Sequence, residues 1–223
     1  MLQPSTIKFL KDLKKNNNKP WFEKNRKQYE QAKNDLAGFI QKVIDQHGKK
    51  DPAIASLQVK DTMFRINRDV RFSKDKSPYK DNMGAYMGRG GKKSVFAGYY
   101  FHCQPGRCFM GGGLWMPMPP ELNKVRQEID YNFAAFKKII GNSKFKSIYG
   151  DLSRDAEYTL SRLPKGYEPG NPAEEYLKLK SFVALAPLKE TDLSSKDLLK
   201  KTLAAFEALH PLLDFINEAI QPD

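Results

Sequence analysis

VFAGYYFHCQPGRCFM, residues 95–110, carries the clearest strand pattern of the chain. Its first nine residues, 95–103, are rich in aromatic side chains, which are typical of strands. Residues 104–107 then place Pro105 and Gly106 at the centre of a turn, an order that suits type II. Residues 108–110 return antiparallel to the first run. The stretch therefore predicts a β-hairpin in the middle of the sequence.

Further strands are predicted on both sides of this hairpin. Residues 83–87 and 181–188 are short and apolar, and we expect a strand in each. From residue 57 to residue 72 apolar and polar side chains alternate, which also predicts a strand, interrupted where Arg68 occupies an apolar position. The glycines 111–113 are expected to end the strand that begins at Cys108.

Helical spacing of apolar residues dominates the two ends of the chain. A first helix capped by Ser5 or Thr6 is expected to end at residues 16–18, and a second to run from Pro20 to Gly48. Later helices are predicted over 121–131, 132–140, 143–149 and 172–180, and a closing helix from Leu198 that Pro211 kinks or restarts.

These elements predict an α+β fold, with a central antiparallel sheet and helices from the N- and C-terminal parts packed on it. No alternating βαβ units are present, so a doubly wound sheet is not expected. We expect one α+β domain over residues 1–223, with residues 1–50 as a helical subregion.

The composition indicates an ordered globular protein with an anionic partner. The chain has 223 residues, is 40% hydrophobic and carries a net charge of +12. Such a charge fits nucleic acid, a phosphorylated metabolite or an acidic surface, although a basic surface that only confers solubility is an equal alternative. We expect no signal peptide after Met1, no membrane span and, with only two cysteines, a cytoplasmic location.

Residues 65–80 are the densest cluster of charge, with six basic and two acidic side chains. A strand that runs into a loop of this kind can present cations to phosphate or carboxylate. In the alternative, Asp69 and Asp75 pair with the arginines and only fix the loop. The residues predicted to contact a ligand are Arg68, Arg71, Ser73, Lys74, Lys76, Tyr79 and Lys80, with Asp69 as a weak catalytic candidate.

Two other groups near the hairpin are weaker candidates. Gly111, Gly112 and Gly113 can expose backbone N–H groups to a ligand, or can mark a bulge where the strand leaves the sheet. Trp115 can line a pocket or lie in the core. The glycines of 88–91 lack the spacing of a phosphate-binding loop and are expected at a mobile hairpin tip.

His102, Cys103 and Cys108 form the single close group of histidine and cysteine residues. A two-residue turn places Cys103 opposite Cys108 and His102 opposite Phe109, so His102 lies on the other sheet face from the cysteines. We therefore expect no metal site, and buried thiols rather than a disulfide. His102 stays a candidate general acid or base. No cofactor is expected, since the sequence contains none of the common hydrolase, zincin or dinucleotide motifs.

The chain resembles the domain-of-unknown-function family 2461 over nearly its whole length. The likeness rests on the Arg68–Lys80 motif above all, because it is long and specific. It implies a single, mostly intracellular domain and transfers no catalytic residue. The other matching residues are Asn17, Asn18, Trp21-Phe22-Glu23, Tyr29, Tyr99-Tyr100, Pro105-Gly106, Gly111-Gly112-Gly113-Leu114-Trp115, Pro117, Glu175-Tyr176-Leu177 and Ser181-Phe182.

Three functions remain open on the sequence. The first is a site for a small phosphate- or carboxylate-bearing ligand, enzymatic or not. The second is a nucleic-acid-binding module, because aromatic side chains that can stack on bases accompany the basic stretch. The third is a structural or partner-binding protein in which residues 68–80 form an internal network of ion pairs.

Overall fold

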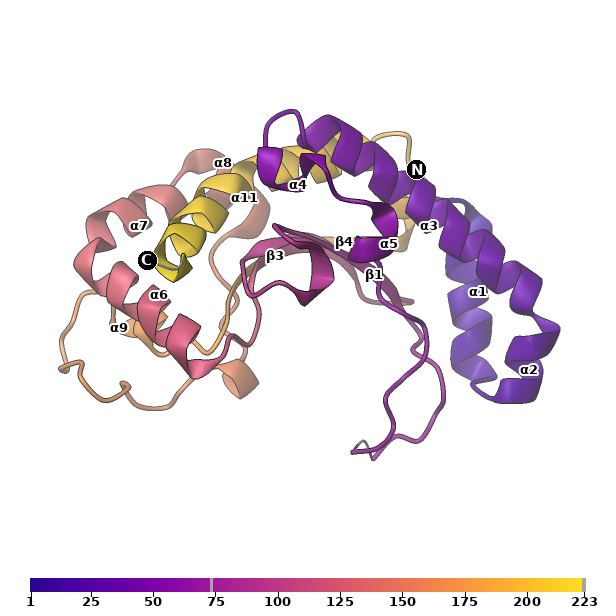
Figure 1. Cartoon of the computed structure of the whole chain (residues 1–223), viewed down its shortest axis with the longest axis horizontal. Helices are drawn as coiled ribbons and strands as arrows, with labels where there is room; N and C mark the ends of the chain where they lie inside the picture. Colours follow the sequence, from indigo (N-terminus) through magenta and orange to yellow (C-terminus); the bar gives the residue numbers. More distant parts are fainter. Residues whose placement is uncertain (73, 222–223) are drawn as a thin grey trace. The chain divides into compact units, whose positions relative to one another are not determined.

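The structure is a computed structural model that describes residues 1–72 and 74–221. Its four strands form one antiparallel sheet in the order β1-β2-β3-β4, and helices flank the sheet. The predicted α+β class is confirmed. The strands are β1 (Met83–Met87), β2 (Gly98–Cys103), β3 (Cys108–Leu114) and β4 (Phe182–Leu188) (Figure 1).

Residue contacts divide the chain into two compact units, each made of three segments. Unit 1 comprises Met1–Lys92, Tyr100–Met110 and Pro187–Ala204, and unit 2 comprises Lys93–Tyr99, Gly111–Ala186 and the chain from Ala205 onward. The sequence thus alternates between the units in six segments. That the chain forms a single domain stays a prediction. In the described residues, no helix has the length and apolar character needed to cross a membrane.

Unit 1 begins with a group of three packed helices, in which α1 and α2 both contact α3 (Figure 1). Leu10 and Leu13 of α1 are fully buried, as are Leu36 and Ile40 of α3. The helices wholly within unit 1 are α1 (Pro4–Lys15), α2 (Lys19–Lys24), α3 (Arg26–His47), α4 (Pro52–Ala55), α5 (Val59–Thr62) and α10 (Glu190–Leu193).

The continuous helix predicted from Pro20 to Gly48 is wrong, because Asn25 interrupts it. Asn25 ends α2 and precedes α3 in a non-helical conformation, and its side-chain amide donates to the carbonyl oxygen of Trp21 at 2.8 Å. Asparagine competes with the helix for backbone hydrogen bonds in this way. The predicted end at Gly48 is confirmed.

The strand predicted over residues 57–72 is also wrong. Residues 59–62 form α5, Met63 makes an isolated bridge to Ala85 of β1, and Asn67 makes one to Tyr79 within the same excursion of the chain. The side-chain alternation is present in the sequence, but among the described residues the segment pairs with β1 only around Met63 and Phe64, where the Phe64 amide donates to the carbonyl of Gly84 at 3.1 Å. Residues 66–68 bond instead to residues 78–80, which lie further along the same excursion of the chain.

The hairpin between β2 and β3 follows the sequence prediction. The Arg107 amide donates to the Gln104 carbonyl at 3.0 Å, and Gly106 has a φ of 80°. That positive φ is what a type II turn requires at its third position. One face of the hairpin packs on α3, where the rings of Phe39 and Phe101 lie 4.9 Å apart.

The core of unit 2 contains a cluster of aromatic rings together with side chains from the longest helix of the chain. The ring of Phe136 is fully buried and lies within 6.4 Å of the rings of Phe133, Tyr176 and Phe215. The Tyr149 hydroxyl donates to the carbonyl of Ala205 at 2.8 Å. The helices here are α6 (Pro119–Tyr131), α7 (Phe133–Ile140), α8 (Ser143–Tyr149), α9 (Glu174–Leu177) and most of α11 (Leu198–Ile220).

The glycines 111–113 continue β3, so the predicted strand break is wrong. All three are buried, and a Cβ atom on Gly111 would overlap the carbonyl oxygen of Ala184 in the neighbouring strand. A Cβ on Gly113 would overlap the carbonyl oxygen of Phe182, and Gly113 also has a φ of 129°. The absence of side chains therefore lets β3 and β4 approach closely.

Candidate functional site

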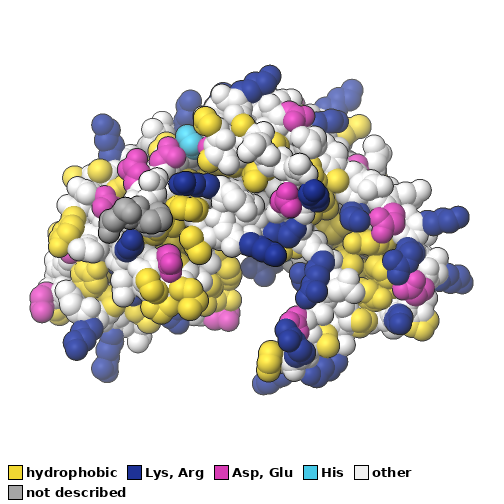
Figure 2. Space-filling model, in the orientation of Figure 1, with side chains coloured by type: hydrophobic (Ala, Val, Ile, Leu, Met, Phe, Trp, Pro, Cys, Tyr) yellow, Lys and Arg dark blue, Asp and Glu magenta, His cyan; other side chains and the backbone are white. Residues whose placement is uncertain are grey.

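Residues 65–80 form a two-limbed excursion of unit 1 between α5 and β1, which we call the basic arm (Figure 1). Near its base, the amide of Arg68 donates to the carbonyl of Pro78 at 2.9 Å, and the amide of Lys80 donates to the carbonyl of Ile66 at 2.8 Å. Figure 2 shows Lys and Arg side chains gathered along this excursion. The sequence prediction of a loop rich in cations is thus correct, but the strand that was to lead into it is absent.

Tyr79 anchors the returning limb of the arm to the helices of unit 1. Its ring is 5% exposed and stacks on Phe22 at 3.9 Å. The side-chain amide of Asn17 completes the anchor, donating to the carbonyl of Tyr79 at 2.9 Å and accepting from its amide at 3.1 Å. Burial also raises the pKa of the Tyr79 hydroxyl. The role that the structure gives Tyr79 is therefore to hold the arm, and a ligand contact by its ring stays a prediction.

Two of the arm's arginines are neutralised inside the arm. The guanidinium of Arg71 contacts the carboxylate of Asp69 through Nε at 3.0 Å and Nη2 at 2.7 Å, and Arg68 pairs with Asp75 at 2.6 Å. Both carboxylates thus pair with arginines of the arm, as the structural alternative for this stretch predicted. The hydrogen bond from Arg71 lowers the pKa of Asp69, and hydrogen bonds from Ser77 lower that of Asp75.

Positive charge remains in excess at the base of the arm. The ammonium of Lys80 donates to the carbonyl of Arg65 at 3.1 Å and lies 5.8 Å from the centre of the Phe64 ring. Burial lowers the pKa of Lys80, and the nearby charges of Arg65 and Arg68 lower it further. In the described part of the chain, neither Arg65 nor Lys80 forms an ion pair. Arg65 was not among the predicted contact residues.

The outer end of the arm is apolar as well as basic. Phe72 is 94% exposed, and the guanidinium of Arg71 lies 5.7 Å from the centre of its ring. The alternation over residues 57–72 places Phe72 on the apolar side of the predicted strand, but none of the described elements covers its ring. Lys76 donates to the carbonyl of Val70 at 2.9 Å, and Lys74 is exposed. Ser73 lies outside the described residues.

His102 is a buried residue of β2 and lies within a chain of hydrogen bonds. Its Nδ1 is 2.9 Å from the Tyr100 hydroxyl, and its Nε2 is 3.1 Å from Oε1 of Gln104. The amide nitrogen of Gln104 donates in turn to Asp81 at 2.9 Å. The ring also stacks on Phe109 at 4.6 Å, which confirms the predicted register of the hairpin.

The hydrogen-bond chain fixes the tautomer of a neutral His102. Because Gln104 uses its NH₂ group to donate to Asp81, its Oε1 can only accept, so Nε2 of His102 carries the proton. Nδ1 then accepts from the Tyr100 hydroxyl. Burial lowers the pKa of His102 and raises that of Tyr100 to about 12. Both ring nitrogens are thus occupied by protein partners, which favours a structural role over acid–base catalysis.

This arrangement predicts a pH effect on stability. Because the folded pKa of His102 lies below its ordinary 6.5, the unfolded chain takes up a proton first as the pH falls. The stabilisation that neutral His102 gives the folded state is fully present above pH 6.5, and it is lost as the pH falls through the pKa of His102 in the folded protein. We expect the free energy of unfolding of His102→Gln to depend less on pH in this window. Urea unfolding of the wild type and of His102→Gln at several pH values measures this difference. If the free energies of unfolding of the two proteins change with pH in parallel, the effect does not come from His102.

The structure describes both cysteines and the side chains that could bind a metal ion. Cys103 and Cys108 are free thiols and both are buried, and the Cys108 thiol donates to the carbonyl of Gln104 at 3.0 Å. Within residues 1–72 and 74–221, no group of three or more His, Cys, Asp or Glu side chains is arranged to hold a metal ion.

Gly111, Gly112, Gly113 and Trp115 belong to unit 2, whereas the arm and His102 belong to unit 1. The glycines are enclosed by strand neighbours, as described above. Trp115 is 57% exposed and meets the ring of Tyr158 edge-on at 4.6 Å, so a core position for Trp115 is wrong. That any of these residues contacts a ligand stays a prediction.

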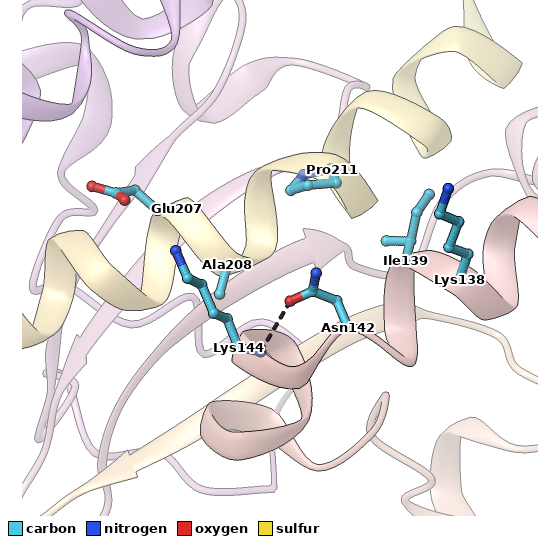
Figure 3. Close-up of a pocket in the computed structure, with 7 residues that line it drawn as sticks. All are labelled: Lys138, Ile139, Asn142, Lys144, Glu207, Ala208 and Pro211. Carbon is cyan, nitrogen blue, oxygen red and sulfur yellow. Dashed lines mark hydrogen bonds between the residues drawn. The ribbon is translucent and has the colours of Figure 1, made fainter.

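Unit 2 also contains a cavity of about 290 Å³ that the sequence did not indicate (Figure 3). It lies where the turn between α7 and α8 meets α11, and the amide of Lys144 donates there to Oδ1 of Asn142 at 2.9 Å. Pro211, within α11, has no N–H to offer the carbonyl of Glu207 one turn earlier. The lining residues are Lys138, Ile139, Asn142, Lys144, Glu207, Ala208 and Pro211.

Comparison with known proteins identifies a family but no activity. A family model described as "Conserved hypothetical protein (DUF2461)" matches residues 5–215. No curated protein and no solved structure matches the chain.

Proposed function

Since this chain belongs to the DUF2461 family of conserved hypothetical proteins, whose description names no activity, we propose a function from the basic arm itself. The function is the binding of a small anionic ligand that carries a phosphate or carboxylate group. The observation that carries the proposal is the excess of cations at the base of the arm, around Arg65, Arg68 and Lys80. Of the two carboxylates of the arm, Asp75 pairs with Arg68, and Asp69, on which the charge of Arg65 also acts, pairs with Arg71.

The ion pairs within the arm support a division of roles among its cations. Arg68 and Arg71 already have carboxylate partners, so an anion gains less from them. Lys80 is half-buried and its pKa is lowered by burial and by neighbouring cations, which an anion would reverse. Arg65 can add a planar fork of N–H donors. We therefore place the anion at Arg65 and Lys80, with Lys74 and Lys76 as outer contacts.

A ligand screen on the full chain tests the proposal. We expect nucleotides, phosphorylated metabolites or small carboxylates to raise the melting temperature beyond the effect of plain phosphate or sulfate. Arg65→Gln and Lys80→Gln should each weaken binding about tenfold, because a hydrogen bond to a charged group contributes about 1.5–3 kcal/mol. Lys42→Gln, which removes one exposed charge from α3, is the matched control and should leave binding unchanged.

Two results would count against this function. One is a wild-type protein that no compound stabilises more than plain phosphate does. The other is a loss of binding in Lys42→Gln equal to that in Lys80→Gln, because the effect would then reflect net charge alone and not a localised site.

Nucleic acid is the second candidate, and the exposure of Phe72 is what favours it. An aromatic ring beside cations can stack on an unpaired base, a contact worth about 1–3 kcal/mol. On this reading, Phe72→Ala should weaken binding of a single-stranded oligonucleotide about tenfold or more, and the affinity should fall steeply with salt. Affinity that ignores salt, or that Phe72→Ala leaves intact, would exclude nucleic acid as the partner of the arm.

A further inference from the structure

Arg126 is a buried arginine in unit 2, distant in sequence from the arm and independent of its proposed function. It lies on α6, and its side chain is on the inner face of that helix together with Val125 and Ile129. The residue is 5% exposed. Arginine is almost never buried without a partner, so its hydrogen bonds and neighbouring charges need an account.

The hydrogen bonds of Arg126 leave most of its donors unused. Its Nη2 donates to the carbonyl of Leu179 at 2.9 Å, and its buried Nε has no acceptor among the described residues. A guanidinium has five N–H groups. The carbonyl of Leu179 is available because the bridge between Thr159 and Leu179 is closed by the hydrogen bonds of Lys178 and Lys180 instead. Within the described residues, the protein thus offers Arg126 one neutral acceptor, the carbonyl of Leu179.

Charge compensation for Arg126 is also lacking within the described part of unit 2. Burial lowers its pKa, and the phenol of Tyr167 is the neighbour that acts against this. Three acids of α6 and the neighbouring α9 have other partners. Asp130 accepts from the Asn171 amide at 2.6 Å, Glu174 pairs with Lys178, and Glu175 pairs with Arg154 at 2.7 Å. No ion pair involves Arg126 among the described residues.

We propose that Arg126 anchors an oxyanion-binding site in unit 2 that takes a carboxylate or phosphate group. A buried cation without a counter-ion is costly to the folded state, and an anion that reaches it removes this cost. The N–H groups that the protein leaves unused form a planar fork that matches two oxygens of one ligand group. The half-buried Tyr167 hydroxyl, whose pKa burial raises, stays neutral and adds a further donor.

Titration of the full chain with inorganic phosphate and, separately, with acetate tests this site and distinguishes the two chemistries. The readout is the ¹⁵N–¹H resonance of the Arg126 Nε group, together with the melting temperature. We expect one probe to shift the resonance saturably, and the dissociation constant to rise about tenfold or more in Arg126→Gln. Arg126→Lys should be intermediate, because it keeps the charge and loses the fork.

Two further variants make the outcome decisive. Arg126→Met should melt at or above the wild-type temperature without anion, because it removes a buried charge and keeps the volume, and its melting temperature should lose the site-specific response to the probe. Lys80→Gln in the arm should keep that response, which separates this site from the proposed function. A wild-type resonance that neither probe moves, or an unchanged response in Arg126→Met, would overturn the proposal.

Discussion

Gly113→Ala is expected to destabilise the protein by about 4 kcal/mol or more, or to prevent folding. A Cβ atom at this position would overlap the backbone oxygen of Phe182 and crowd Cα of Val183 in the adjacent strand. Backbone atoms in the interior of a sheet cannot rotate away as a side chain can. The φ of 129° at Gly113 adds strain, since side chains other than glycine rarely adopt it. Urea unfolding monitored by circular dichroism measures the loss.

Three control substitutions separate the two causes. Gly111→Ala has the overlap with a strand neighbour but no positive φ, so we expect a loss only slightly smaller than that of Gly113→Ala. Gly166→Ala has a φ of 97° in open space and should cost about 1–2 kcal/mol from backbone strain alone. Gly38→Ala in α3 meets nothing and should stabilise by about 0.5–1 kcal/mol. Equal losses for Gly113→Ala and Gly166→Ala would show that close strand packing is not the cause.

Pro211→Ala is expected to stabilise the protein by about 2–3 kcal/mol, an unusual direction for a single substitution. Pro211 is exposed and lies within α11, where its ring takes the place of an N–H that would bond the carbonyl four residues earlier. Alanine restores that donor and is the strongest helix former. Because the side chain of Pro211 is exposed, the exchange removes little buried apolar surface.

The same experiment reports on the cavity beside this proline. Glu218→Ala, an exposed change on the same helix with no backbone consequence, is the control and should alter stability by less than about 0.5 kcal/mol. If Pro211→Ala destabilises the protein instead, then the proline ring itself is required for packing of α11 against the turn between α7 and α8.

The features that local chemistry decides could be predicted from the sequence. Pro105 and Gly106 select the turn, and the turn sets the register that pairs His102 with Phe109. The strands at 83–87 and 182–188 and the end of α3 at Gly48 follow in the same way. The strand predicted over 57–72 failed because alternation shows which side chains face together, whereas a strand also needs consecutive pairing with a neighbour, and this segment meets β1 only around Met63 and Phe64 among the described residues.

The site was predicted only as far as charge density allows. The sequence located the basic arm, but it could not show that Arg68 pairs with Asp75 and Arg71 with Asp69, since pairing depends on how the two limbs fold back. Arg126 was missed although a signal existed. It falls between Val125 and Ile129 on the apolar stripe of a predicted helix, and a cation on such a stripe indicates either a partner or a ligand.

The alternation of the chain between the two units restricts how this protein can have evolved. Each unit is drawn from three separate stretches of sequence. No single exchange of a gene fragment can therefore transfer either unit intact to another protein, and no single truncation can leave one unit whole and remove the other. Both units must therefore be inherited together. An insertion that enlarges one unit has to fall within a loop and leave the order of the six segments, with the five junctions between them, unchanged.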